Sequence, residues 1–218
     1  MYIPALHRAP DDAALRALIA RHPLATWVCQ ADGALVVNQV PFVLDPGSGP
    51  QGRLLGHVAR GNRVWRQLGT GIPAVAVFQG PQAYITPGWY PGKQAHGRVV
   101  PTWNYTVVHA HGMARVIDDA AAVLDLLHRL TDANEATLPR PWHVDEAPAD
   151  YIAQLMASIV GIEITIDRLE GKWKLSQDEA PEDRAGTVRG LQACPGEVAQ
   201  DLARLVAHAM ARRGGEGA

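Results

Sequence analysis

The chain has 218 residues, a length that fits one large domain or one domain with an appendage. Hydrophobic residues make up 47% and charged residues 19%, which is typical of a globular protein with a substantial core. The 20 basic and 22 acidic residues give a net charge of −2. This balance argues against a broad face that binds nucleic acid by charge, so DNA binding would need a local basic patch.

Cysteine usage and the N-terminal sequence indicate a compartment. Cys29 and Cys194 are the only cysteines and lie far apart, which excludes a disulfide scaffold and a cysteine-based zinc site. The N-terminus has no apolar run typical of a secretory signal. No stretch approaches 18 apolar residues, so we expect no membrane span and a cytoplasmic protein.

Helices are expected near both ends of the chain and in its middle. The first follows Asp11 and Asp12, with Leu15, Leu18 and Ile19 at helical spacing, and ends at His22-Pro23. The others are expected at 62–68, capped by Asn62, after a cap at Asp118, at 149–159 and at 182–213 with a break near Pro195-Gly196.

Strands are expected mainly in the first half, and most are joined by short turns such as Asp32-Gly33, a strong hairpin signal. They are predicted at 24–30, 34–44, 53–59, 74–78, 83–86, 103–117 and 160–169, which 172–175 could extend. Residues 87–101 form a long loop that contains Trp89 and Tyr90. The pattern predicts an α+β protein built on an antiparallel β-barrel with peripheral helices.

Two motifs are weak evidence for a dinucleotide site and for a metal site. Residues 47–52 match G-x-G-x-x-G, but Pro50 interrupts the motif and a strand follows, so a plain loop is the better interpretation. His109 and His111 point to one face of a strand, yet no third ligand is visible by spacing, and hydrogen-bonded histidines are more common than a metal site. We therefore expect no metal.

Three polar and aromatic clusters are more informative. They are residues 56–62, residues 100–105 and residues 172–177, and together they supply cations, amides and aromatic faces. A phosphorylated planar heterocycle would use such groups. The residues alone thus indicate an antiparallel barrel that could bind a phosphorylated aromatic ligand.

The same clusters carry a resemblance that spans nearly the whole chain. Met1-Tyr2-Ile3-Pro4, Gly56-His57-Val58-Ala59-Arg60-Gly61-Asn62, the run 78–90, Val100-Pro101-Thr102-Trp103-Asn104-Tyr105 and Lys172-Trp173-Lys174-Leu175-Ser176-Gln177 follow in order. The sequence resembles the PaiB-like family of FMN-binding negative transcriptional regulators. The resemblance implies the split β-barrel of pyridoxamine-phosphate-oxidase-like flavoproteins, over residues 1–178, with a C-terminal helical extension over residues 179–218.

The resemblance also implies a cofactor and residues that bind it. It implies FMN at the interface of a homodimer, with Arg60 and Lys174 supplying positive charge to the phosphate. His57, Asn62, Ser176 and Gln177 would add polar contacts, and Thr102, Trp103 and Asn104 would line the isoalloxazine or ribityl region. The family usually has Asn where this chain has Asp178, whose carboxylate would repel a phosphate that it faced.

Three functions are weighed. The first is a negative transcriptional regulator with flavin as ligand or sensor, and the alternative is a small FMN-dependent oxidoreductase. The third is a binding module that has lost the use of its cofactor. No helix-turn-helix pattern is convincing. The C-terminal arginines Arg204, Arg212 and Arg213 are the best basic candidates for DNA, although the apolar positions of that helix favour packing. The sequence identifies no catalytic residue.

Overall fold

The computed structural model describes residues 1–214 as an α+β fold with one seven-stranded sheet. The strands are β1 (Leu24–Ala31), β2 (Ala34–Pro41), β3 (Val43–Asp45), β4 (Arg53–Ala59), β5 (Ile72–Ile85), β6 (Thr102–Ile117) and β7 (Ile159–Lys174). The α-helices are α1 (Asp12–Arg21), α2 (Gly92–Ala95), α3 (Ala120–Glu135), α4 (Ala149–Met156), α5 (Pro181–Ala193) and α6 (Glu197–Gly214). Short 3-10 helices are η1 (Ala5–His7), η2 (Arg63–Gln67), η3 (Pro87–Trp89) and η4 (Val144–Glu146).

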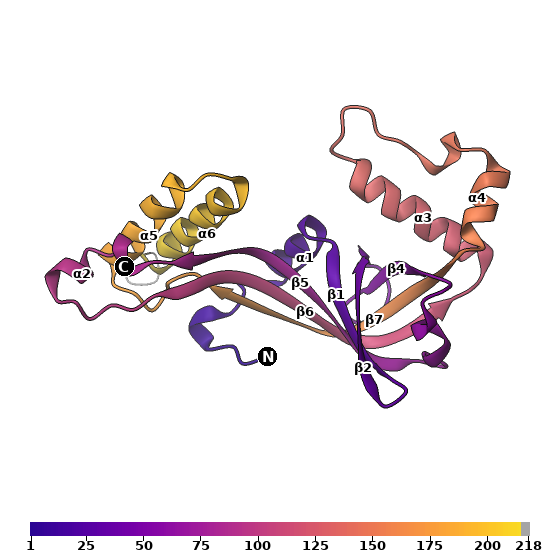
Figure 1. Cartoon of the computed structure of the whole chain (residues 1–218), viewed down its shortest axis with the longest axis horizontal. Coiled ribbons are helices and arrows are strands. Elements are labelled where there is room, and N and C mark those ends of the chain that lie inside the picture. Colours follow the sequence, from indigo (N-terminus) through magenta and orange to yellow (C-terminus); the bar gives the residue numbers. More distant parts are fainter. Residues whose placement is uncertain (215–218) are drawn as a thin grey trace. The chain divides into compact units, whose positions relative to one another are not determined.

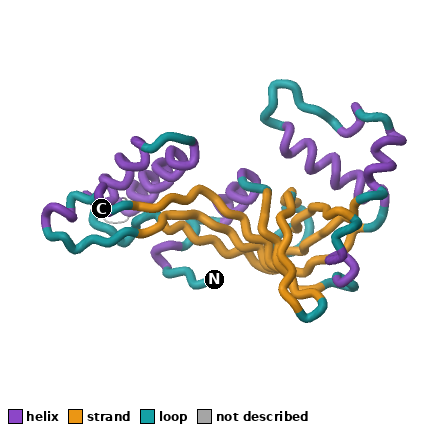
Figure 2. Tube along the Cα trace, in the orientation of Figure 1, coloured by secondary structure: helices purple, strands orange, loops and turns teal. Residues whose placement is uncertain are grey.

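The chain forms two compact units. Unit 1 comprises Met1–Leu15, Gln79–Val108 and the segment from Glu170 to the end of the described chain, and unit 2 comprises Arg16–Phe78 and His109–Leu169. The labelled elements of each unit can be followed in Figure 1, and their helices, strands and loops in Figure 2. The predicted division after residue 178 stays a prediction.

The sheet runs in the order β2-β1-β5-β6-β7-β4-β3. Strands β1 and β2 form the predicted hairpin over their full length, from Leu24 opposite Pro41 to Ala31 opposite Ala34. Asp32 and Gly33 have φ angles of 51° and 75°, the positive values that a tight hairpin turn of this kind requires. The β1–β5, β3–β4 and β4–β7 pairs are also antiparallel, in agreement with the predicted antiparallel sheet, although β3 and β4 are the only consecutive strands among these three pairs.

Two strand predictions are wrong. The predicted strand 34–44 is divided into β2 and β3, which pair with β1 and β4 respectively. The residues 74–78 and 83–86 do not form two strands, because β5 runs without a break through Gly80 and Pro81. Strand β1 pairs with β5 only over Ala74–Val77. Beyond Val77, β5 has no β1 residue to pair with on that side. A proline, which has no N–H to donate, is therefore tolerated there. Similarly, β7 continues to Lys174 and includes the predicted extension.

The helix predictions are mostly confirmed. Asn62 caps η2, which is a 3-10 helix, by accepting a hydrogen bond from the Val64 backbone N–H. The cap of α3 is Asp119, one residue after the predicted Asp118, and its carboxylate accepts from the backbone of Ala122. The G-x-G-x-x-G segment is a loop that leads into β4, as its context predicts.

Each unit has its own buried side chains. In unit 2, Trp27, Phe42, Phe78, Leu54 and Ile164 are almost fully buried. In unit 1, α5 and α6 bury Leu191, Leu202 and Val206. The apolar face of α6 is therefore used in packing, in agreement with the sequence pattern.

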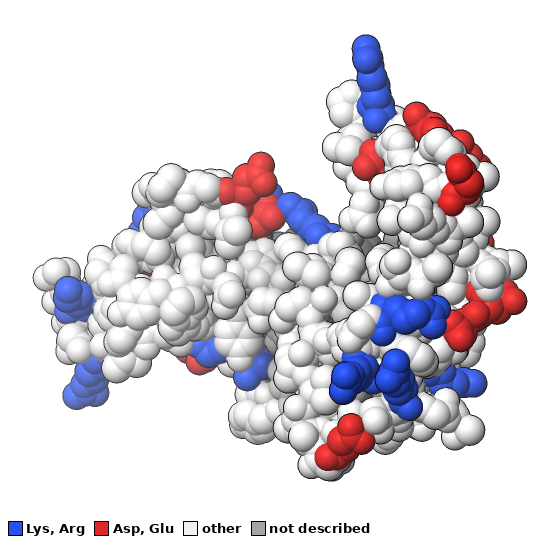
Figure 3. Space-filling view, turned by 45° about the vertical axis from the view of Figure 1, so that its right-hand side comes forward, with Lys and Arg blue, Asp and Glu red and all other residues white. Residues whose placement is uncertain are grey.

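The described part of the chain contains no helix long and apolar enough to cross a membrane. On the face shown in Figure 3, Lys and Arg side chains lie in small groups, and uncharged surface covers most of the area around them.

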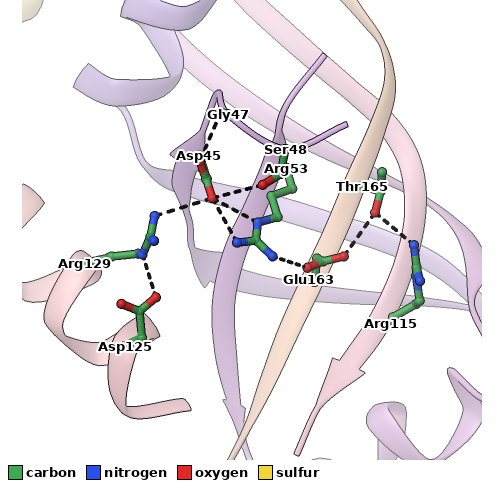
Figure 4. A network of polar contacts seen from close by, with 9 residues as sticks. All are labelled: Asp45, Gly47, Ser48, Arg53, Arg115, Asp125, Arg129, Glu163 and Thr165. Atoms are coloured by element: carbon green, nitrogen blue, oxygen red, sulfur yellow. Dashed lines mark hydrogen bonds and ion pairs between the residues drawn. The ribbon is translucent and has the colours of Figure 1, made fainter. Parts of the chain in front are cut away.

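A network of ion pairs joins four elements of unit 2 (Figure 4). Arg53 on β4 contacts Asp45 on β3 at 3.0 Å and Glu163 on β7 at 2.8 Å, and Arg129 on α3 lies 3.4 Å from Asp45. Partial burial of Asp45 acts to raise the pKa of its carboxyl. Hydrogen bonds from Arg53 and Gly47 and the charges of Arg53 and Arg129 outweigh that effect, so the pKa lies below its ordinary value of 3.8.

We expect Arg53→Met to destabilise the protein by about 2 kcal/mol at pH 7, because two largely buried carboxylates would lose their shared partner. Because the pKa of Asp45 is lower in the folded protein than in the unfolded chain, its ionised carboxylate stabilises the fold above pH 3.8. This stabilisation is lost as the pH falls through the pKa of the folded protein. The difference between variant and wild type should therefore shrink below about pH 4. Urea unfolding at pH 7 and pH 3 measures both quantities, and a constant difference would contradict this account.

Candidate functional site

The residues predicted to bind FMN fall into two groups, one in each unit. Unit 1 holds Thr102, Trp103 and Asn104 at the start of β6, and Lys174, Ser176 and Gln177 at the end of β7 and just beyond it. Unit 2 holds His57, Arg60 and Asn62.

The structure brings Lys174, Thr102 and Trp103 together. The Lys174 ammonium donates hydrogen bonds to the Thr102 hydroxyl and, at 3.0 Å, to the Trp103 backbone carbonyl. Both acceptors are uncharged, so these bonds fix the position of the ammonium without neutralising it. An ammonium has three donors, which leaves one for an anionic or carbonyl ligand.

Two aromatic rings meet at the start of β6. The indole of Trp103 is 53% exposed and meets the half-exposed ring of Tyr84 edge to face, with ring centroids 6.1 Å apart. Tyr105 follows Trp103 by two positions on β6, and Lys172 precedes Lys174 by two positions on β7. The Lys172 ammonium lies 5.6 Å from the ring centroid of Tyr105. Because side chains alternate along a strand, Trp103 and Tyr105 share one face of β6, and Lys172 and Lys174 share one face of β7. We call Trp103, Tyr105, Lys172 and Lys174 the cation–aromatic face.

The neighbouring polar residues are buried. Asn104 and Ser176 are fully buried, and the Asn104 amide lies 2.9 Å from the Ser176 hydroxyl. Gln177 accepts from the Leu175 backbone N–H and donates to the Trp173 carbonyl, each at 2.6 Å. These bonds close the turn after β7, where Ser176 has a φ of 59°. The structure thus uses all three amide and hydroxyl side chains to shape the turn, and their contact with FMN stays a prediction.

Acidic residues follow the turn. Asp178 lies 3.9 Å from the imidazole of His7. Burial raises the pKa of the Glu179 carboxyl, and the charges of Asp178 and Asp183 raise it further, while Lys174 lowers it. A carboxylate at this turn would repel a phosphate that it faced.

Helix α5 holds the long loop after β5. The Asp183 carboxylate of α5 accepts a hydrogen bond from the Gly92 backbone N–H at 2.8 Å. A Cβ on Gly186 would lie 2.1 Å from the Trp89 carbonyl oxygen, and one on Gly190 would lie 2.1 Å from the Trp89 ring. The two glycines are four residues apart on one helix face. Because neither has a side chain, Trp89 packs directly against this face of α5. The sequence analysis missed this role, although the spacing Gly-x-x-x-Gly was visible.

Arg60 in unit 2 is already engaged. Its guanidinium donates to the carbonyls of Ala157 and Ile159 at 3.0 Å each and to Asp118 at 3.1 Å. It also lies over the Trp65 ring, 5.6 Å from the centroid. The side chain is 40% exposed, so one edge is still accessible, and its contact with a phosphate stays a prediction.

Asn62 and His57 have different surroundings. The Asn62 amide donates to the Asn38 side chain at 2.6 Å in addition to capping η2. The His57 ring is half-buried, and burial lowers its pKa, so the imidazole is neutral at pH 7 and brings no charge to a phosphate. His109 and His111 share one face as expected, with ring centroids 6.0 Å apart.

Comparisons with known proteins define the class. The family model described as "Putative FMN-binding domain" matches residues 1–168. An uncharacterised protein of Emericella nidulans is 31% identical over 98% of this chain and 98% of its own length. The Bacillus subtilis protease synthase and sporulation protein PAI 2 is 26% identical over 94% of this chain and 96% of its own length.

A solved structure shows the fold. The FAD and heme binding protein from Mycobacterium smegmatis matches with a TM-score of 0.55 at 21% identity, over 82% of this chain and 79% of that chain. The predicted α+β split β-barrel is thereby confirmed. The chain belongs to the family of FMN-binding domains that matches it, and FMN is confirmed as its cofactor at the level of that family.

Proposed function

We propose that this protein is an FMN-binding negative regulator of transcription in which FMN is a ligand or sensor. The proposed FMN site is supported mainly by the cation–aromatic face of unit 1. It offers an exposed indole on which a flavin ring could stack and an ammonium with a free donor. The regulatory role rests on the resemblance to the PaiB-like family and on the similarity to the Bacillus sporulation protein.

In the proposed complex, Trp103 and Thr102 line the flavin and Lys174 supplies positive charge to it. The hydrogen bonds of Asn104, Ser176 and Gln177 fix the start of β6 to the turn after β7. Contacts of Arg60 and Asn62, which belong to unit 2, with FMN stay predictions. His57 has an apolar environment and is left out of the phosphate contacts.

One experiment separates the regulator from the small oxidoreductase. The purified protein is loaded with FMN and mixed with reduced nicotinamide under exclusion of oxygen. A regulator should keep its oxidised flavin band on the timescale of minutes, and a gene repressed in wild-type cells should be derepressed by a variant that cannot bind FMN. Rapid, repeated bleaching with no change in transcripts would favour the oxidoreductase.

We further propose a homodimer that shares the flavin. Apolar side chains are exposed in both units, including Leu35 and Val37 on the edge strand β2 and Trp103 beside Lys174. A stable interface of about 1,600 Å² would cover such residues. Sedimentation of the holoprotein, followed at the flavin band, should show a dimer that releases flavin when dilution dissociates it. A monomer that retains FMN would contradict the proposal.

Direct DNA binding by the isolated protein should be weak. Arg204 pairs with Asp201, and the Arg212 and Arg213 side chains lie outside the described residues. The logarithm of the binding constant falls with the logarithm of salt by about 0.9 per phosphate contacted. We expect a shallow slope, corresponding to a few contacts, that an Arg212→Ala/Arg213→Ala variant reduces further. Tight binding with a steep slope would reveal a DNA-binding surface that this account lacks.

A further inference from the structure

Unit 1 contains a pocket that the proposed FMN site does not use. The N-terminal segment around η1, the end of β7 and helix α6, which is labelled in Figure 1, surround a volume of about 320 Å³. This size is at the lower end of pockets that hold small molecules. Eight of the eleven lining residues are apolar, and the other three are Arg8, Gln177 and His208.

Two walls of the pocket are held in place by regular structure. In the N-terminal segment, Arg8 pairs with Lys172 of β7 in an antiparallel bridge, and the Ala9 backbone N–H donates to the Gly171 carbonyl at 3.1 Å. These contacts fix the backbone of Arg8 beside the end of β7. On α6, the lining residues are three and four positions apart and therefore share one face of the helix. They are Leu205, His208 and Ala209.

The pocket lies on the opposite face of β7 from the cation–aromatic face. Trp173 stands between Lys172 and Lys174 in the strand, and successive side chains of a strand point to opposite faces. The Trp173 side chain, which lines the pocket, therefore points away from the two lysines. A ligand in this pocket would leave both lysines accessible to FMN.

The polar groups of the lining favour an anion. None of the lining residues is Asp or Glu. Arg8 is exposed, and its guanidinium has no hydrogen-bond or ion-pair partner among the residues that the structure describes. The His208 imidazole, also exposed, adds an N–H donor. The amide of Gln177 is engaged in the turn after β7, so Arg8 is the group that selects the charge of a ligand.

A carboxylate matches this lining better than a phosphate does. A guanidinium presents parallel N–H groups that fit the two oxygens of a carboxylate, and their pairing is charge-assisted. One arginine balances one negative charge, whereas a phosphate monoester carries about 1.5 to 2 negative charges at pH 7. The apolar residues of the lining would remove an apolar body from water, which stabilises the complex.

We propose that this pocket binds a small monocarboxylate with an apolar body. The carboxylate pairs with Arg8, and the body lies against Trp173, Leu175 and Leu205. The apolar lining supplies affinity, and the guanidinium selects ligands that carry a negative charge. The inference does not rest on the proposed FMN function.

Two probes of nearly the same shape but different charge test the proposal. Cinnamate carries a carboxylate, and cinnamamide has a neutral amide in its place. Calorimetric titration of the wild-type protein should show one cinnamate per chain and binding of cinnamamide at least about tenfold weaker. The titration is repeated with excess FMN, because the cation–aromatic face could also attract an aromatic anion. Cinnamate should bind with the same affinity in both titrations.

Variants then assign the site. Arg8→Met should weaken cinnamate at least about tenfold and leave cinnamamide nearly unchanged. Arg189→Met, at an exposed arginine of α5 in the same unit, is the matched control and should bind both probes as wild type does. Ala209→Phe, which narrows the pocket from α6, should weaken both probes.

Four results would overturn the proposal. They are no measurable binding of cinnamate, equal affinity of the wild type for both probes, unchanged cinnamate binding by Arg8→Met, and displacement of cinnamate by FMN. The last result would place the probe in the flavin site. The first two are read from the wild-type protein, so they do not depend on the folding of any variant.

Discussion

Replacing Lys174 with methionine is expected to weaken FMN binding at least about tenfold and to change riboflavin binding little. The two flavins differ by the phosphate, and a charge-assisted contact to a phosphate contributes about 1.5–3 kcal/mol. Among the described residues, the Lys174 ammonium donates hydrogen bonds to neutral oxygens of Thr102 and Trp103, and its charge also lowers the pKa of Glu179. Its remaining donor is available to a ligand. Titration of flavin-free protein with FMN and with riboflavin, followed by flavin fluorescence, measures both affinities.

The matched control is Lys93→Met, since Lys93 is an exposed lysine of α2 in the same unit. It should bind both flavins as wild type does. Equal losses of FMN and riboflavin in Lys174→Met would place the ammonium beside the ring system, and no loss of either would remove Lys174 from the site.

Replacing Gly186 with alanine is expected to destabilise the protein by about 3 kcal/mol, although alanine normally favours a helix over glycine. The added Cβ would lie 2.1 Å from the Trp89 carbonyl oxygen, a backbone atom that moves only if the whole loop moves. The hydrogen bond from Gly92 to Asp183 would be strained as well. Urea unfolding measures the change in the free energy of unfolding.

Gly61→Ala is the control for this substitution. Its Cβ would meet nothing within 4 Å, and Gly61 does not have a positive φ, so we expect a change within about 0.5 kcal/mol. If Gly186→Ala were as stable as wild type, the close packing of Trp89 against α5 would not be a determinant of stability.

Local patterns in the sequence were sufficient to predict most of the fold. The hairpin at Asp32-Gly33, the strand 53–59 and the break between α5 and α6 depend on turn residues and periodicity that lie close together in the chain. The continuity of β5 could not be predicted in this way. Whether Pro81 interrupts a strand depends on which neighbour pairs there, and that is a long-range property of the sheet.

The site was harder to predict than the fold. The polar and aromatic clusters and the family resemblance gave Trp103 and Lys174 as candidates, and the structure brings these two residues together. The burial of Asn104, Ser176 and Gln177 depends on a turn with a positive φ at a non-glycine residue, which no local signal indicates. The surroundings of Arg60 depend on the backbone carbonyls of Ala157 and Ile159, and those of His57 on residues of α3, α4 and β7. All of these are distant in the sequence.

The central claim is that this chain binds FMN, and one measurement tests it most directly. Flavin-free protein is mixed with excess FMN and passed through a desalting column, and the flavin retained is quantified by its absorbance and identified after release. We predict about one FMN retained per chain, with a shifted flavin band. Protein that retains no flavin, and that shows no binding when titrated with FMN, would contradict the account.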